Sequence, residues 1–319
     1  MKDVLKMAPQ QCDLLKPLFS APSNNSSSHK YPEGKEFAVC LVHDVGIISP
    51  SLPNVFYYCY RHMKKGSIKN GFKMLFSRFS RQFNPFFNFE KLIELERKYG
   101  AISGFYFSVL NKGEKGYNYN ISDLACELKN IRENGWEVGF LGSPDSLFDL
   151  EEIVSRKMKL EDVLRDKVVG YVDPFNSLNN PENWIILYQA GFEYMTAFVD
   201  PVNHFGESVC YPFRAYDPEI KDVDITVLPL NVIDFNASES FGNANLNDDD
   251  DIENTWESIK KIIDYVSECS GILTLRFPSE AMIGNGLFFY ERILSYCSKK
   301  NVWMTSGKKI TDWWRSFHT

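Results

Sequence analysis

The sequence predicts an α/β protein with a mostly parallel β-sheet, and two observations support this. Apolar strand-like runs alternate with amphipathic helical runs about seven times from Glu36 onward, which is typical of repeated βα units. Of the 319 residues, 44% are hydrophobic and 24% are charged, an ordinary composition for a globular protein with a large core. The number of units suits a barrel or a doubly wound sheet, and the pattern alone leaves both open.

Each predicted element rests on its apolar spacing and on the residues at its ends. Gly100 and Gly135 follow two helical runs and are placed to end them. Pro181 stands in the first turn of another helix, where its missing N–H does no harm. The predicted strands are 36–45, 101–110, 136–142, 168–174, 192–199, 224–235 and 271–277, with 301–306 following. The predicted helices are 87–100, 123–135, 149–167, 181–191, 253–269, 288–300 and 308–317.

The chain divides into an N-terminal segment with a flexible linker, residues 1–35, and one large domain, residues 36–319. Residues 22–30, PSNNSSSHK, are polar and serine-rich, as a linker would be. Residues 53–87 form a long basic and aromatic excursion after the first strand. This excursion is compatible with a lid, with a rim, or with a pair of covering helices.

Charge and cysteine content restrict the compartment and the partners. The net charge of -7 argues against nucleic acid and anionic membrane as main partners. Seven cysteines without a C-x-x-C pair indicate reduced thiols in a cytoplasmic protein. We expect no secretory signal and no membrane span, because no apolar run is long enough.

Polar residues stand at or near the ends of several predicted strands, where α/β barrels place their chemistry. His43 and Asp44 end the first strand, Asp145 follows the third, and Asp173 lies at the end of the fourth. Arg214 lies in the segment YPFRAYD. It could face a pocket and bind a ligand through two hydrogen bonds, or it could pair with Asp217.

Eight segments of the chain carry a further resemblance. LVHDVG (41–46) is similar to the motif L-T-H-D-V-D, and WEVGFLGSPDS (136–146) to E-I-G-L-H-G-S-Y-D-S. CYPFRAYDPE (210–219) is similar to Y-P-F-x-x-Y-D. Five other segments resemble further motifs of the same set, and all eight occur along the chain in the order of those motifs. These motifs are those of the polysaccharide deacetylase family, with its NodB homology, carbohydrate esterase 4-type fold. The likeness covers about residues 36–316 and implies a distorted (β/α)7-type barrel.

The resemblance also implies a reaction, hydrolysis of the amide of N-acetyl sugars. The family uses a divalent metal such as zinc, held by an aspartate and two histidines, with a second aspartate as base and a late histidine as acid. Such a site lowers the pKa of a bound water and stabilises the oxyanion. Of these positions only Asp44 is retained here. The others fall on Gly46, Leu141, Asp145 and Phe277, and the family's arginine falls on Val172.

Because leucine cannot ligate a metal and phenylalanine cannot donate a proton, we expect a degenerate member of the family without a cofactor. Asp44 is then the candidate catalytic residue, and the candidate binding residues are His43, Asp145, Asp173 and Arg214. An alternative is a divalent metal site rebuilt from Asp44 and Asp145. For His43 and Asp44, hydrogen bonding at a strand end is a purely structural alternative, and Asp145 could simply cap a helix.

Three functional readings remain. The first is a non-catalytic protein that binds a carbohydrate or scaffolds an enzyme of polysaccharide synthesis. The second is an active metal-dependent N-deacetylase with a rebuilt site. The third is a structural barrel within an oligomer.

Overall fold

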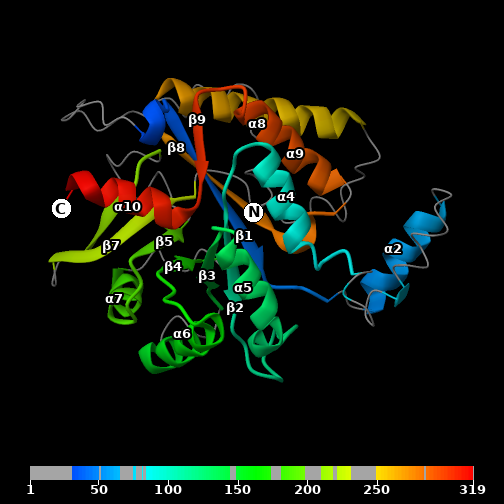
Figure 1. Ribbon diagram of the computed structural model, residues 1–319, viewed down its shortest axis with the longest axis horizontal. Helices are drawn as coiled ribbons and strands as arrows, with labels where there is room; N and C mark the ends of the chain where they lie inside the picture. The colour runs from blue at the N-terminus through cyan, green and yellow to red at the C-terminus, as the bar shows by residue number, and fades with distance from the viewer. Residues whose placement is uncertain are drawn as a thin grey trace.

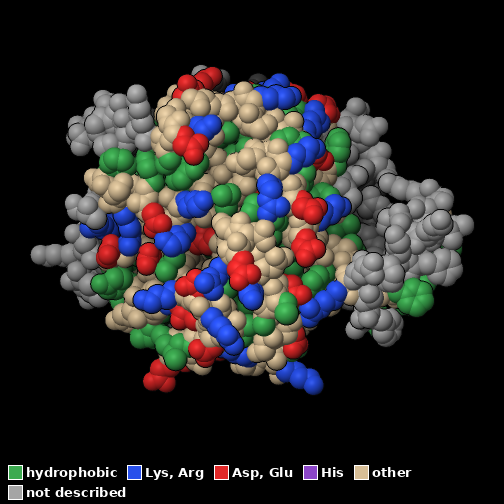
Figure 2. All heavy atoms as spheres, in the orientation of Figure 1, with side chains coloured by type: hydrophobic (Ala, Val, Ile, Leu, Met, Phe, Trp, Pro, Cys, Tyr) green, Lys and Arg blue, Asp and Glu red, His purple; other side chains and the backbone are tan. Residues whose placement is uncertain are grey.

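A computed structural model of the protein describes residues 31–49, 52–64, 75–76, 81, 84–143, 149–173, 181–197, 210–217, 221–230, 249–283 and 285–318. In these ranges strands and helices alternate along the chain as the sequence predicts (Figure 1). Figure 2 shows basic and acidic side chains interspersed over the face in view. None of the described helices combines the length and the apolar character that crossing a bilayer requires.

One mixed sheet forms the centre of the molecule. Its strands are β1 Phe37–Val45, β2 Gly104–Ser108, β3 Glu137–Leu141, β4 Gly170–Val172, β5 Tyr194–Ala197, β6 Phe213–Asp217, β7 Lys221–Pro229, β8 Ile272–Pro278 and β9 Val302–Thr305. The order across the sheet is β6-β7-β5-β4-β3-β2-β1-β8, and β9 pairs with the first half of β1. All described pairings are parallel except β6 with β7. The antiparallel β6 is an addition that the strand pattern did not predict.

The sheet curls into an incomplete barrel, which confirms the distorted barrel class. Its two edges approach each other before β6, where the main-chain N–H of Ile272 donates to the carbonyl of Cys210 over 2.7 Å. Seven parallel strands, β7-β5-β4-β3-β2-β1-β8, form the continuous wall. The carboxyl ends of these strands form one end of the barrel, which we call the mouth.

Helices surround this wall (Figure 1). They are α2 Leu52–Lys64, α4 Phe89–Lys98, α5 Ala125–Glu133, α6 Leu150–Leu164, α7 Pro181–Gln189, α8 Asp249–Glu268, α9 Asn285–Cys297 and α10 Gly307–His318. Gly100 and Gly135 lie two positions after the last residues of α4 and α5 and have φ of 67° and 90°. This conformation is open to glycine, so both predicted helix ends are confirmed. Helix α8 begins at Asp249, inside the run of four aspartates at residues 248–251, and carboxylates favour a helix N-terminus.

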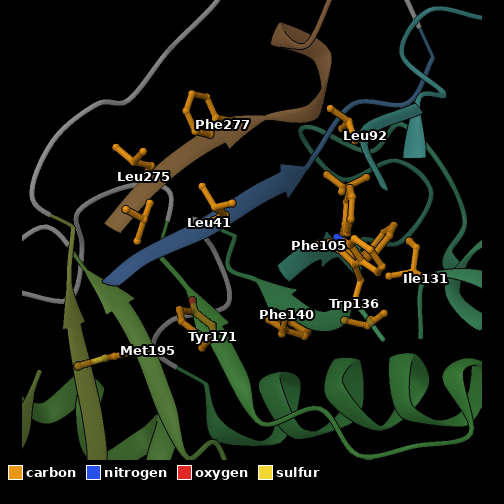
Figure 3. Packing of buried hydrophobic residues seen from close by; sticks show 14 of the residues in the cluster. Leu41, Leu92, Phe105, Ile131, Trp136, Phe140, Tyr171, Met195, Leu275 and Phe277 are labelled. Atoms are coloured by element: carbon orange, nitrogen blue, oxygen red, sulfur yellow. The ribbon is translucent and has the colours of Figure 1, made fainter. Parts of the chain in front are cut away.

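The strands separate two apolar layers, because successive side chains point to opposite faces. Phe37, Val39 and Leu41 of β1 join the large cluster between the sheet and the helices, part of which appears in Figure 3. Ala38, Cys40 and Val42 join a smaller cluster inside the barrel, together with side chains from β2, β3, β4, β5, β7 and β8. Side chains on this inner face, near the carboxyl ends of the strands, are the ones that could form a site at the mouth.

Two tyrosines fill the inside of the barrel. The hydroxyls of Tyr106 and Tyr194 lie 2.6 Å apart, and that of Tyr194 donates to Glu137. A Cβ on Gly139 would lie 2.2 Å from the ring of Tyr106, and one on Gly170 would lie 2.2 Å from the hydroxyl of Tyr194. These glycines therefore make room for the rings, and the inside of the barrel is packed rather than hollow.

Candidate functional site

His43 and Asp44 do not form one site, because neighbouring strand residues point to opposite faces of the sheet. His43 faces the helices α4 and α9. Its Nε2 lies 2.7 Å from Glu96 Oε1, and its ring stacks on Phe105 with centroids 4.9 Å apart. Glu96 also accepts from Trp136 Nε1 at 2.5 Å and from the Tyr290 hydroxyl at 2.8 Å. His43 and Glu96 are both fully buried.

This network joins the sheet to α4 and α9 and has no described path to the mouth. Buried polar groups need such partners, since leaving them unpaired costs about 1–3 kcal/mol each. The geometry therefore favours the structural alternative for His43 over a binding role. The partners lie 53 and 247 positions away in the sequence, which explains why the sequence pattern did not reveal them.

Asp44 points the other way, into the barrel at the mouth, and a basic residue of the neighbouring strand meets it there. Arg276 Nε lies 2.9 Å from Asp44 Oδ2. Arg276 Nη1 also donates to the main-chain carbonyl of Asp173 over 3.3 Å. Asp44, Asp173 and Arg276 are 6%, 1% and 4% exposed. Three strand ends, those of β1, β4 and β8, thus converge on one buried guanidinium.

A fourth ionisable group, Glu280, lies in the short 3-10 helix Ser279–Ala281 directly after β8. Burial, and next the negative charge of Asp44, raise the pKa of Glu280 to about 7. Its Oε2 is buried and has no hydrogen-bond partner among the described residues. We call Asp44, Asp173, Arg276 and Glu280 the mouth cluster. It combines a buried ion pair with a carboxyl group that can give or take a proton near neutral pH.

Two of these four residues, Asp44 and Asp173, were predicted from the sequence. Arg276 was not, because the family's late histidine was placed at Phe277, which faces the helices and lies 4.6 Å from Tyr290 between ring centroids. Arg276 pairs in register with Val42, whose side chain faces the inside of the barrel. A single charged residue inside the apolar run ILTLRF was the signal available.

The remaining predicted residues do not join the mouth cluster in the described part of the chain. Arg214 lies on the edge strand β6, opposite Thr226, and its side chain is exposed. Asp145 lies outside the described residues, and so does the side chain of Asp217, so the helix-cap and ion-pair alternatives for them stay predictions.

The described residues do not fit the divalent metal that the family resemblance implies. A metal on Asp44 would have to share this carboxylate with a guanidinium 2.9 Å away, and two cations at one carboxylate repel each other. Leu141 faces the inside of the barrel as part of the apolar inner cluster. Within the described ranges no group of three or more His, Cys, Asp or Glu side chains could hold an ion.

Comparison with solved structures identifies the architecture. A Mycobacterium smegmatis protein crystallised as a candidate polysaccharide deacetylase superimposes with a TM-score of 0.60 at 18% identity, over 91% of this chain and 93% of that one. The fold is that of a polysaccharide deacetylase. No family model matches the sequence, and no curated protein sequence does.

Two further neighbours of the deacetylase fold superimpose less closely. One is a peptidoglycan deacetylase of Bacillus subtilis, with a TM-score of 0.43 and 9% identity, over 88% of this chain and 93% of that one. The other is a CE4 family pseudoenzyme from Bacillus anthracis, with a TM-score of 0.39 and 12% identity, over 88% and 66% of the two chains.

Proposed function

We propose that this chain is a degenerate polysaccharide deacetylase-like protein that binds a carbohydrate, or scaffolds an enzyme of polysaccharide synthesis, without metal-dependent hydrolysis. The observation that carries the proposal is the ion pair of Arg276 with Asp44. A carboxylate buried at a strand end needs a nearby positive charge, and here a side chain of the protein supplies it.

The mouth cluster also carries groups that can bind a neutral sugar. Glu280 is its partly exposed member, whereas Asp44, Asp173 and Arg276 are buried and would support that contact from behind. Carboxylates accept hydrogen bonds from hydroxyls, and a guanidinium donates them in a fixed planar array. Glu280 can act as acceptor when ionised and as donor when protonated. This chemistry fits recognition of hydroxyl and acetamido groups and requires no ion.

Metal analysis combined with an acetate-release assay tests the proposal. The purified protein would be equilibrated with zinc, cobalt or manganese, desalted, analysed for bound metal, and incubated with N-acetylglucosamine oligomers. We expect no stoichiometric metal and no acetate release, and we expect oligomer binding by calorimetry that Glu280→Gln weakens. One bound ion per chain that disappears in Asp44→Ala, together with acetate release, would instead establish the alternative, an active deacetylase rebuilt around Asp44 and Asp145.

Binding of N-acetylglucosamine oligomers distinguishes the carbohydrate-binding role from the scaffold role. Binding without hydrolysis supports a carbohydrate-binding protein. Failure to bind any oligomer, with metal also absent, would leave the scaffold role, which co-purification with a polysaccharide synthase would then have to demonstrate.

A further inference from the structure

Helix α2 exposes an apolar stripe that packing does not explain. Leu52, Phe56, Tyr60 and Met63 are 56%, 63%, 66% and 54% exposed. Their spacing of four, four and three positions places them on one side of the helix. Val55 is buried in a small cluster with Phe86. The helix therefore already has a packing face, and the exposed stripe is a second apolar face.

The segment that carries α2 also differs in charge from the rest of the chain. Residues 45–89 contain seven Lys or Arg and no Asp or Glu. The whole chain carries -7, so the remaining sequence carries -14. The net charge, which argues against anionic partners, thus hides a basic segment within an acidic protein. Charge segregated in this way along the sequence favours an anionic partner for the segment that carries it.

The position of α2 suits a docking element. In Figure 1 the helix stands out at one side of the barrel, and Figure 2 shows hydrophobic side chains at the outer edge of this region. The segment is tied back to the body at its base. Asn118 Oδ1 accepts from the main-chain N–H of Ile48 at 2.8 Å, and Arg81 Nη1 lies 2.6 Å from Glu127 Oε1 of α5. Only seven residues separate Asp44 from Leu52.

An anionic lipid bilayer satisfies both features at once. An amphipathic helix rich in Phe, Leu and similar residues, with basic residues in its neighbourhood, lies in the headgroup region with its apolar face in the acyl boundary. Each nearby cation adds about 1 kcal/mol on an anionic leaflet. A second copy of the chain fits less well, since a two-fold contact would bring the same basic segment against itself.

We propose that α2 docks this protein onto an anionic membrane surface, with Leu52, Phe56, Tyr60 and Met63 in the interface. The helix has 13 residues and is about 20 Å long at the usual rise per residue, so it lies on the bilayer and does not cross it. Such docking would hold the mouth cluster near the lipid surface. The proposal stands independently of whether the mouth binds a sugar.

Vesicle co-sedimentation tests the proposal with the full chain. The probes are vesicles of phosphatidylcholine alone and of phosphatidylcholine mixed with phosphatidylserine. We expect sedimentation with the mixed vesicles, little with the neutral ones, and a decrease as salt rises. Phe56→Ser should reduce partitioning about tenfold, since much of a Phe transfer energy is lost. Tyr60→Ser should act in the same direction.

Phe288→Ser is the matched control, because Phe288 on α9 is exposed to the same 63% as Phe56. It should leave partitioning unchanged, and circular dichroism would verify the fold of each variant. No sedimentation with mixed vesicles, or equal loss in Phe288→Ser, would overturn the proposal. So would a dimer in light scattering that Phe56→Ser converts to monomer, since the stripe would then serve a second copy.

Discussion

Removing Arg276 should leave a buried carboxylate without its cation, and the size of the effect can be worked from the structure. At 2.9 Å and an effective dielectric constant of about 20, the attraction is about 6 kcal/mol. Desolvation of both groups offsets much of this, so the intact pair adds little net stability. Breaking it from one side typically costs about 3–5 kcal/mol. We therefore expect Arg276→Met and Asp44→Asn each to lose roughly this much free energy of unfolding.

A double-mutant cycle measures the coupling directly. Urea unfolding would be followed by tryptophan fluorescence, with equal m-values showing that the unfolded states are comparable. The double variant should be more stable than the two single losses predict, by about 2–3 kcal/mol. The control is Arg132→Met, because Arg132 Nε lies at the same 2.9 Å from Asp166 Oδ2 but both side chains are about half exposed. It should lose no more than about 1 kcal/mol. Additivity within about 0.5 kcal/mol at the mouth cluster would refute the reasoning.

Two further predictions concern stability. The folded-state pKa of Glu280, about 7, lies above its unfolded value, so wild-type stability should fall as pH rises from 4.5 through 7. Glu280→Gln should remove this slope and be more stable at pH 8 by up to about 3 kcal/mol; identical pH profiles in denaturation would contradict it. Gly139→Ala forces a Cβ to within 2.2 Å of Tyr106 and should cost about 3 kcal/mol, whereas Gly46→Ala, with Leu141 Cδ2 at 3.9 Å, should cost little. Thermal melts of both variants test the difference.

The strand positions could be predicted because they depend on local patterns that repeat along the chain, whereas the deacetylase-like barrel followed from the family resemblance. Six of the eight predicted strand segments contain a parallel strand of the sheet in full, and the segments 271–277 and 224–235 overlap β8 and β7. The hairpin of β6 with β7 was not predicted. Its first strand was treated only as a family motif, and its pairing depends on contacts between segments rather than on apolar alternation.

The mouth cluster was only half predictable, for a different physical reason. Asp44 and Asp173 follow from strand ends, which are local. Arg276 depends on the register between β8 and β1, since a shift of one residue exchanges the inner and outer faces. Assigning the late family position to Phe277 selected a residue on the outer face of β8, one position away from Arg276 on the inner face. Glu280 could not be singled out, because its raised pKa comes from burial and from Asp44, which lies 236 positions earlier.

We infer that the residues at Gly46 and Leu141, which cannot ligate a metal, and the presence of Arg276 are physically one feature. Asp44 is 6% exposed, and an isolated carboxylate at that depth would be costly. With Gly46 and Leu141 at neighbouring positions, the described residues supply no ligand set for a metal that would balance the charge, and a cation from the protein is needed. Conversely, while the Arg276 guanidinium is paired with Asp44, a histidine introduced at Leu141 would not create a metal site. A metal ion bound there would be repelled by the fixed positive charge of Arg276. A variant intended to bind zinc would therefore need Arg276 neutralised as well as histidines introduced.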